Sequence, residues 1–508
     1  MAFFEVLKPA PALNPRLGSL SIPGKPAIPT PNYIANTSRG VVPHLSQDNL
    51  EKHTDINGLY LGLEDFIEKA PSETPPVFNT PTCSSKQSSP LRRFIAARDA
   101  QPLVLGPRRV PALDSPGSNT NAGIQVHTSV GHRALSSAYY AAAAVKLAPD
   151  VVVGLADVMP GHPCPSLKRV EKMGDRTAAW MRDLVAAVRG IEGNGDDASG
   201  CGMANGNGNA NADGTSASSS AKRGPAIFAP ILPIEPEQQS FYLSDLTSSP
   251  KLSSHLSGLA LYSSSSLACI PSPLSHLPRL SLANPATPAQ LLHAISLGTD
   301  IFVLPLVDAA TDAGMALVFE FPAPVPSADQ LKGDEKGGEE EEEEEKEEEK
   351  KEKTQKRPLA LNAWDPIYAT SPSPPQSDCP CYTCTRHSLA YLQHLLRAKE
   401  MLAWVLLSLH NHAVVSRLFS NARSTLQSAE GSDAFEAERA RFERAYEEEL
   451  PLRTGQGPRV RGYMARSRGP GEARRNERAF VGVGVGGRET QGKNGGWLES
   501  QGQNAWAS

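Results

Sequence analysis

The sequence lacks any apolar run long enough to cross a membrane, because no stretch approaches the roughly 18 apolar residues that a transmembrane helix needs. Its first residues (MAFFEVLKPAPALNPRLG) lack the basic leader and apolar centre of a signal peptide. The formal net charge of −5 provides no overall attraction to nucleic acid, although a local basic face is not excluded. We therefore expect a soluble, intracellular protein.

Cysteine is also sparse, with seven residues in a chain of 508. The number is odd, and three of the seven lie between positions 379 and 384. A secreted domain held together by disulfides usually has an even number of cysteines that are distributed along the chain. This distribution favours a reducing compartment.

Three segments lack the large apolar side chains that a packed core requires. Residues 190–223 are mostly Gly, Asn, Ser and Ala, residues 325–358 contain a nearly continuous run of Glu and Lys, and residues 451–508 are rich in Gly and Arg. Such segments cannot recover their ordering entropy by burial, so we expect a disordered insert, an acidic low-complexity linker and a disordered tail.

Between these segments, short β-type runs alternate with helical patterns. Strands are predicted at residues 103–105, 151–155, 226–232, 258–262 and 301–306, and helices at residues 136–146, 167–189 and 288–297. Strand, helix and strand in this order form parallel βαβ units, so the pattern predicts an α/β sheet or barrel.

Helix boundaries can be read in two regions. Thr287 can cap a helix that Pro288 begins, and Gly298 can end it before the next strand. Residues 386–426 carry leucines and valines at helical spacing, which predicts one long amphipathic helix or a helix pair. Residues 434–449 are helical but highly charged, so we expect that helix to face solvent.

The crowded cysteines suggest a metal site. Cys379, Cys381 and Cys384 are followed after 25 residues by His410. Three thiolates and one imidazole suit tetrahedral zinc, whose Zn–S bonds of about 2.3 Å would hold the cysteine loop against the helical region. Four protein ligands leave no open position for a reactive water, so the predicted role of the zinc is structural.

Two alternatives remain open from spacing alone. The cysteines could be reduced and metal-free, or Cys381 and Cys384 could form a redox pair. The fourth ligand is also undecided, since His387, His394 and His412 compete with His410.

The segment CPCYTCTRHSLAYLQHLLRAKEMLAWVLLSLHN resembles the zinc signature of the tRNA-guanine transglycosylase family in its cysteine spacing and in its closing Leu-His-Asn. The resemblance assigns the zinc to Cys379, Cys381, Cys384 and His410. Weaker resemblance covers residues 15–50, 167–177 and 294–314.

The resemblance also implies a fold and a domain plan. The fold would be a TIM-type (β/α)8 barrel with a zinc-binding helical subdomain. The barrel would occupy residues 1–324, interrupted by the insert at 190–223. After the linker at 325–358, the zinc-binding subdomain and C-terminal helices would occupy residues 359–450, followed by the tail at 451–508.

The catalytic members of this family use an aspartate nucleophile on a strand that reads approximately G-[VI]-D-x-F-D-C-V-x-P-T-R-x-A-R-x-G. Residues 298–314 have the same length, and Asp300 and Phe302 match. The nucleophile position holds Val303, which has no atom that could attack a ribose. We therefore predict no catalytic residue in this chain.

Other functional positions are changed as well. The family's Thr-Arg pair is replaced by Asp308 and Ala309, and its second Arg by Asp312, so negative charge stands where positive charge would meet RNA phosphate. The Gly-Gly segment that recognises the base is missing, and residues 233–236 read Pro-Ile-Glu-Pro. These losses indicate a non-catalytic family member.

The resemblance thus implies a subunit that forms a heterodimer with a catalytic queuine tRNA-ribosyltransferase subunit and meets tRNA through that complex. It implies a cytoplasmic location. The family's animal members also associate peripherally with the outer mitochondrial membrane, and this association is left open for the present chain. Two alternatives are an active transglycosylase with a relocated nucleophile, Asp300 or Asp157, and a zinc-stabilised RNA-binding protein that has no enzyme partner.

Overall fold

The computed structural model describes residues 3–8, 13–70, 72–81, 89–114, 118–160, 166–193, 224–324 and 356–452. Most of the predicted insert, linker and tail lies outside these residues. The predicted boundaries need adjustment where the structure reaches them. Helix α4 (Leu167–Gly193) includes the first residues assigned to the insert, and residues 356–358 and 451–452 join the folded part.

The central element is a closed barrel of eight strands in the order β10-β11-β12-β13-β4-β5-β6-β9, and all neighbouring strands are parallel. The strands are β4 (Asn32–Asn36), β5 (Leu59–Gly62), β6 (Leu103–Gly106), β9 (Val151–Val153), β10 (Ala226–Ile231), β11 (Leu256–Leu261), β12 (Arg279–Ser281) and β13 (Ile301–Val303). This confirms the predicted TIM-type barrel.

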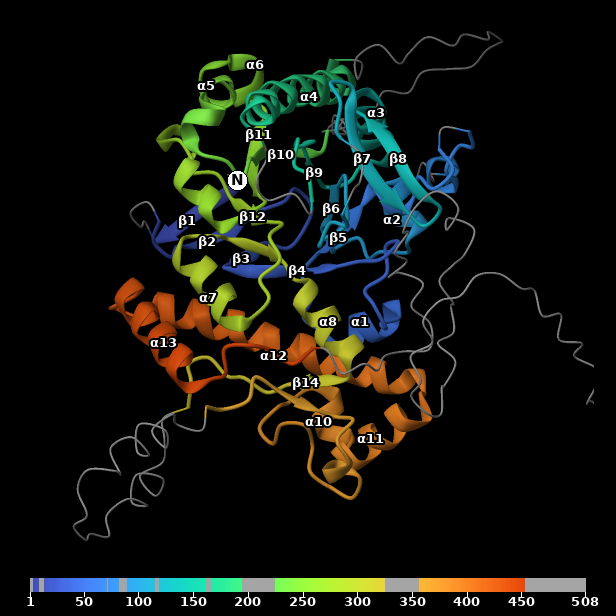
Figure 1. The fold of residues 1–508 in the computed structure, drawn as a ribbon, viewed down its shortest axis with the longest axis vertical. Helices are drawn as coiled ribbons and strands as arrows, with labels where there is room; N and C mark the ends of the chain where they lie inside the picture. The colour runs from blue at the N-terminus through green and yellow to red at the C-terminus, as the bar shows by residue number, and fades with distance from the viewer. Residues whose placement is uncertain are drawn as a thin grey trace, which may run out of the picture.

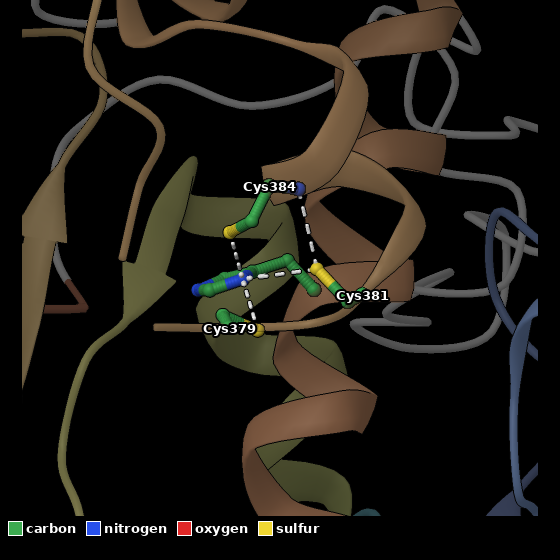
Figure 2. Close-up of side chains that lie close together, drawn as sticks. Cys379, Cys381 and Cys384 are labelled. Atoms are coloured by element: carbon green, nitrogen blue, oxygen red, sulfur yellow. Dashed lines mark hydrogen bonds between the residues drawn. The ribbon is translucent and has the colours of Figure 1, made fainter. Parts of the chain in front are cut away.

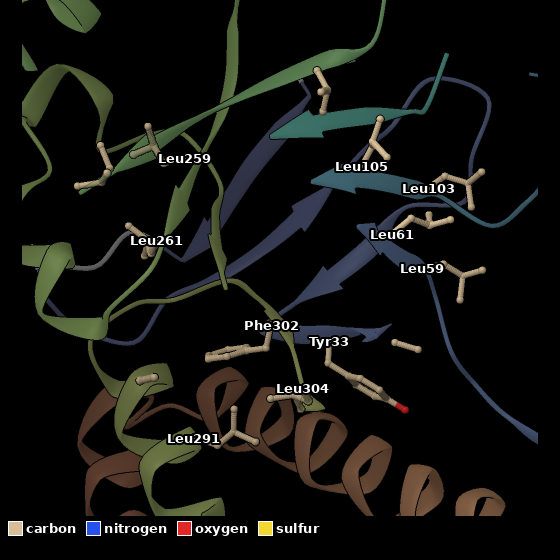
Figure 3. Close-up of a cluster of buried hydrophobic side chains, with 14 of the residues drawn as sticks. Tyr33, Leu59, Leu61, Leu103, Leu105, Leu259, Leu261, Leu291, Phe302 and Leu304 are labelled. Carbon is tan, nitrogen blue, oxygen red and sulfur yellow. The ribbon is translucent and has the colours of Figure 1, made fainter. Parts of the chain in front are cut away.

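Alternation along these strands divides the apolar core into two layers. One set of side chains fills the barrel interior, including Ile34, Tyr60 and Val303. The neighbouring residues, such as Tyr33 and Phe302, point outward against the helices (Figure 3). Because both faces are buried, the strands read as continuous apolar runs.

Helices surround the barrel (Figure 1). Their bounds are α1 (Gln47–His53), α2 (Pro90–Phe94), α3 (Ser137–Leu147), α4 (Leu167–Gly193), α5 (Ser240–Ser248), α6 (Pro250–Ser253), α7 (Pro288–Ser296), α8 (Pro305–Ala313), α10 (Tyr382–Arg386), α11 (Leu389–Ala398), α12 (Met401–Gln427) and α13 (Ser432–Ala445). Within the described ranges, no helix is both long and apolar enough to cross a bilayer.

Three small sheets lie outside the barrel. The first is the antiparallel sheet of β1 (Phe4–Lys8), β2 (Leu17–Leu20) and β3 (Ile28–Thr30), and the second is the hairpin of β7 (Gly123–Thr128) and β8 (Gly131–Ser136). The third pairs β14 (Met315–Leu317) with β15 (Ala360–Asn362). It therefore joins the end of the predicted barrel domain to the start of the predicted zinc-binding subdomain.

Local signals in the sequence correspond to observed helix ends. The Thr287 hydroxyl accepts a hydrogen bond from the backbone N–H of Gln290 at the start of α7, and Gly298 has a φ of +90° just after its end. The region 386–426 forms a helix pair, α11 and α12, separated near Lys399, whose φ is +55°.

Two predictions about elements were partly wrong. The strand predicted at 301–306 ends at Val303, because Pro305 begins α8. Helix α13 was expected to face solvent, yet it buries Phe435 and Phe442 completely. Their rings pack near Phe321 at centroid distances of 5.5 and 6.4 Å, so α13 covers part of the core.

Candidate metal centre

Cys379, Cys381, Cys384 and His410 come together in one place (Figure 2). Their ligand atoms all lie within 4.8 Å of one another. Cys379 precedes α10, while the Cys381 sulfur caps that helix by accepting a hydrogen bond from the backbone N–H of Cys384 at 3.3 Å. Cys384 therefore lies in a short helix and not in the predicted loop.

The distances agree with tetrahedral zinc. The Nδ1 atom of His410 lies 3.8, 3.6 and 3.3 Å from the sulfurs of Cys379, Cys381 and Cys384. A zinc ion with Zn–S of about 2.3 Å and Zn–N of about 2.0 Å would separate sulfur from nitrogen by about 3.5 Å. The three thiols are free, so no disulfide competes for this arrangement.

The competing histidines lie elsewhere. The ring of His387 stacks on Tyr391 at 5.5 Å, and His394 is exposed on α11. His412 is buried, but its Nδ1 lies 3.2 Å from the Tyr33 hydroxyl. Of the four candidates, only His410 joins the cysteine cluster.

The cluster has unusual electrostatics because three ionisable sulfurs are crowded together. Hydrogen bonds with Cys381 and Cys384 lower the pKa of Cys379. The hydrogen bonds that Cys384 makes with Cys379 and Cys381 raise the pKa of Cys384. Burial lowers the pKa of His410, but its bonds to the sulfurs outweigh that effect and raise it to about 9. A bound divalent cation would neutralise the thiolates and displace these protons.

The backbone around the cluster fixes the orientation of its ligands. The Nε2–H of His410 donates to the Leu317 carbonyl at 2.8 Å, which leaves Nδ1 facing the sulfurs. The Thr383 hydroxyl donates to the Leu406 carbonyl at 2.7 Å and thereby holds α10 on α12. The cysteine spacing gave no signal for either contact.

At the carboxyl ends of the barrel strands, where TIM barrels place their reactive groups, the side chain of Val303 is fully buried. It belongs to the apolar interior together with Tyr60 and Phe228. The position that the family resemblance assigns to the nucleophile is therefore part of the core.

The two proposed substitute nucleophiles are already bound. Asp157 forms ion pairs with Arg169 and Arg176 and accepts a hydrogen bond from Asn119 at 2.6 Å. Asp300 is fully buried at the amino end of β13, where it pairs with Arg16 through an Nε–Oδ1 bond of 2.8 Å. Neither carboxylate faces an open site with a free oxygen.

Arginines near the mouth of the barrel are also engaged internally. Arg108 donates to the Val158 carbonyl at 2.9 Å, and Arg109 pairs with Glu64 at 2.9 Å. The Arg108 side chain lines a small pocket whose other walls include Tyr60 and Tyr262. These cations hold the loops of the mouth together.

The two aspartates that replace the family's Thr and second Arg behave differently. Asp312 lies 2.7 Å from the Nε2 atom of His44. Burial is the main cause that raises the pKa of Asp308 to about 8, and Asp312 raises it further although a hydrogen bond from Asn36 opposes this. Burial therefore lowers the negative charge that the sequence predicts at Asp308 near neutral pH.

This shift predicts a pH-dependent stability. The unfolded chain releases the Asp308 proton near its ordinary pKa of 3.8, but the folded chain retains it up to about 8, so stability falls as pH rises between these values. We expect Asp308→Asn to stabilise the protein at pH 8 by on the order of 2 kcal/mol and to have little effect near pH 4. Urea unfolding of both proteins across this range would measure it, and a constant difference would contradict the assignment.

Fold and site together define a (β/α)8 barrel protein with a Cys3His cluster that can hold a metal ion. A family model described as queuine tRNA-ribosyltransferase matches residues 12–448. The chain belongs to this family.

Individual relatives support the same placement. The chain is 32% identical over 467 residues to the queuine tRNA-ribosyltransferase accessory subunit 2 of Schizosaccharomyces pombe, covering 91% of this chain and 88% of that protein. It is 25% identical over 434 residues to the accessory subunit 2 of Xenopus tropicalis, covering 82% and 94%. A queuine tRNA-ribosyltransferase of Dehalococcoides mccartyi is 39% identical over 87 residues, which are 17% of this chain and 21% of that protein.

Proposed function

We propose that the chain is the non-catalytic subunit of a heterodimeric queuine tRNA-ribosyltransferase, which exchanges guanine for queuine at the wobble position of the tRNA anticodon. The observation that carries this proposal is the burial of Val303 in the barrel interior. A valine there supplies no nucleophile, and the nearby carboxylates are held in ion pairs. The name of the relatives, accessory subunit 2, supports the pairing with a catalytic subunit.

The same proposal includes one structural zinc ion per chain, bound by Cys379, Cys381, Cys384 and His410. The near-tetrahedral distances and the soft donor set support zinc over oxygen-preferring cations. Four protein ligands close the site, so the ion would stabilise the fold and would take no part in base exchange.

A row of aromatic rings where α1 meets α10 and α11 supports a site for the partner. The rings of His53, Tyr382, His387 and Tyr391 follow one another at centroid distances of 4.4, 5.6 and 5.5 Å. Tyr382 and Tyr391 remain 39% and 41% exposed. Because exposed aromatic clusters frequently form the centre of protein interfaces, we propose that this row contacts the catalytic subunit.

The zinc site would support this row directly. Cys384 lies in α10 between Tyr382 and His387, so a metal bound to Cys384 would fix the short helix that presents both rings. The proposed structural zinc and the proposed heterodimer are therefore connected through α10.

Association measurements test this surface. We expect Tyr391→Ala to weaken binding to the catalytic subunit by at least about tenfold, because truncation of a central aromatic residue can cost 2 kcal/mol or more. The control is Phe241→Ala on α5, which removes an 86% exposed ring from the opposite end of the molecule (Figure 1). Equal affinity of the Tyr391 variant and the unaltered chain would reject this surface as the interface.

The other two functions receive less support. An active transglycosylase would need a free nucleophile, but Asp157 and Asp300 are both paired. An independent RNA-binding protein would gain support from free cations around the mouth, but Arg108, Arg109, Arg169 and Arg176 are all engaged. We also propose a cytoplasmic location, which includes the surface of the outer mitochondrial membrane. Only the family resemblance supports this part of the proposal.

A further inference from the structure

The backbone carbonyl that orients His410 belongs to β14, a strand of only three residues. One side of β14 pairs with β15, where Leu317 lies opposite Ala360. Its other side faces α12, and there the Leu317 carbonyl accepts the Nε2–H of His410 at 2.8 Å. The position of β14 therefore determines where the imidazole ring points.

On the side of β14 that faces α12, one side chain binds both ends of the strand. The Asn411 Oδ1 atom accepts the Leu317 N–H at 2.9 Å, and its Nδ2 donates to the Met315 carbonyl at 3.0 Å. The same Nδ2 donates to the Thr311 hydroxyl of α8 at 3.0 Å. Asn411 is fully buried, so water cannot replace these bonds.

Two adjacent residues of α12 take part in this arrangement. His410 offers its Nδ1 atom as a candidate metal ligand. Asn411 hydrogen-bonds both ends of β14, and the Leu317 carbonyl of β14 accepts the Nε2–H of His410. Through Thr311, the same amide also reaches α8, the helix that follows the buried Val303 strand. The Asn411 amide thus links β14 beside the candidate metal centre to α8 of the barrel.

We infer that Asn411 is a positioning residue for the metal. By fixing β14, it keeps the Leu317 carbonyl on the Nε2–H of His410 and so keeps the Nδ1 lone pair directed at the space between the three sulfurs. This inference rests on the proposed metal occupancy of the site. Removal of such an outer hydrogen-bonding partner typically reduces metal affinity by about 10- to 100-fold.

The test compares metal retention in variants of the full chain. We expect Asn411→Ala to lose zinc to a competing chelator at an affinity about 10- to 100-fold lower than the unaltered chain. The matched control is Asn421→Ala on the same helix, whose Nδ2 donates to the Phe321 carbonyl at 2.8 Å, away from the cluster. It should retain zinc as the unaltered chain does.

The absorption spectrum of bound cobalt provides a second measurement. Loss of stability alone, without a change in the position of His410, would leave this spectrum unchanged. We expect the visible absorption bands of the cobalt-loaded Asn411→Ala protein to shift, because His410 would no longer be held in place, while the Asn421→Ala spectrum stays unchanged. If Asn411→Ala does not fold, Thr311→Val removes one partner of Asn411 and should reduce affinity by less than about tenfold.

The outcomes are distinguishable. Unchanged zinc affinity and an unchanged cobalt spectrum in Asn411→Ala would overturn the inference, as would equal losses in the Asn411 and Asn421 variants. Failure of the unaltered chain to bind zinc or cobalt would instead overturn the proposed metal centre.

Discussion

His410→Ala should reduce bound zinc from about one ion per chain to a small fraction and should destabilise the protein by at least about 3 kcal/mol. Structural zinc contributes roughly 10 kcal/mol or more to folding when four ligands are present, and loss of one ligand removes part of that energy. His410 is also completely buried, so its removal leaves a cavity among the three sulfurs. Elemental analysis and thermal unfolding would measure the two effects.

Two control variants separate metal loss from general destabilisation. His412→Ala removes a buried histidine from the same helix, but that ring contacts Tyr33 and lies outside the cluster, so zinc should remain bound. Cys269→Ala removes a buried cysteine whose sulfur contacts the Ile234 carbonyl, and zinc should again remain. A Cys384→Ser protein with full metal content would refute the assigned ligand set.

The sequence predicted the residues of the Cys3His cluster better than its surroundings. Cys379, Cys381 and Cys384 were recognisable because three such residues at close spacing are rare, and the family resemblance selected His410 among the nearby histidines. The role of Leu317 could not be predicted, because its contribution is a backbone carbonyl, and any residue type carries one. Asn411 follows His410 in the sequence, but its contacts with β14 could not be predicted because only the fold brings β14 against α12.

The barrel was also predicted only in part. Strands β6, β9, β10, β11 and β13 coincide with predicted apolar runs, whereas β4, β5 and β12 were missed. β12 has three residues and begins with Arg279, and β4 begins and ends with asparagine, so neither reads as an apolar run. Eight strands could therefore be expected from the family resemblance and not from periodicity.

Charge at the barrel mouth depends on tertiary contacts that the sequence does not encode locally. Asp308 and Asp312 look alike in sequence, yet burial raises the pKa of Asp308 despite a hydrogen bond from Asn36, whereas Asp312 contacts His44. Similarly, Asp157 is a possible nucleophile by its position in the sequence, but in the fold it is paired with Arg169 and Arg176. Residue identity alone therefore overestimated the negative charge available at these positions.

The central claim is that this chain provides a scaffold for exchange chemistry performed by another subunit. The covalent step requires a nucleophile at the ribose, and Val303 cannot supply one because its side chain is an alkyl group buried in the barrel interior. Precise placement of tRNA would fail as well, because the arginines at the mouth are committed to contacts within the chain. The aromatic row proposed as the interface keeps Tyr382 and Tyr391 exposed.

Incorporation of a labelled base into tRNA tests this claim most directly, with this chain alone, the catalytic homologue alone, and both together at equal concentrations. The account predicts no exchange above background by this chain alone, and higher exchange by the mixture than by the catalytic homologue alone. Steady incorporation by this chain alone, or a mixture no more active than the catalytic homologue, would contradict it.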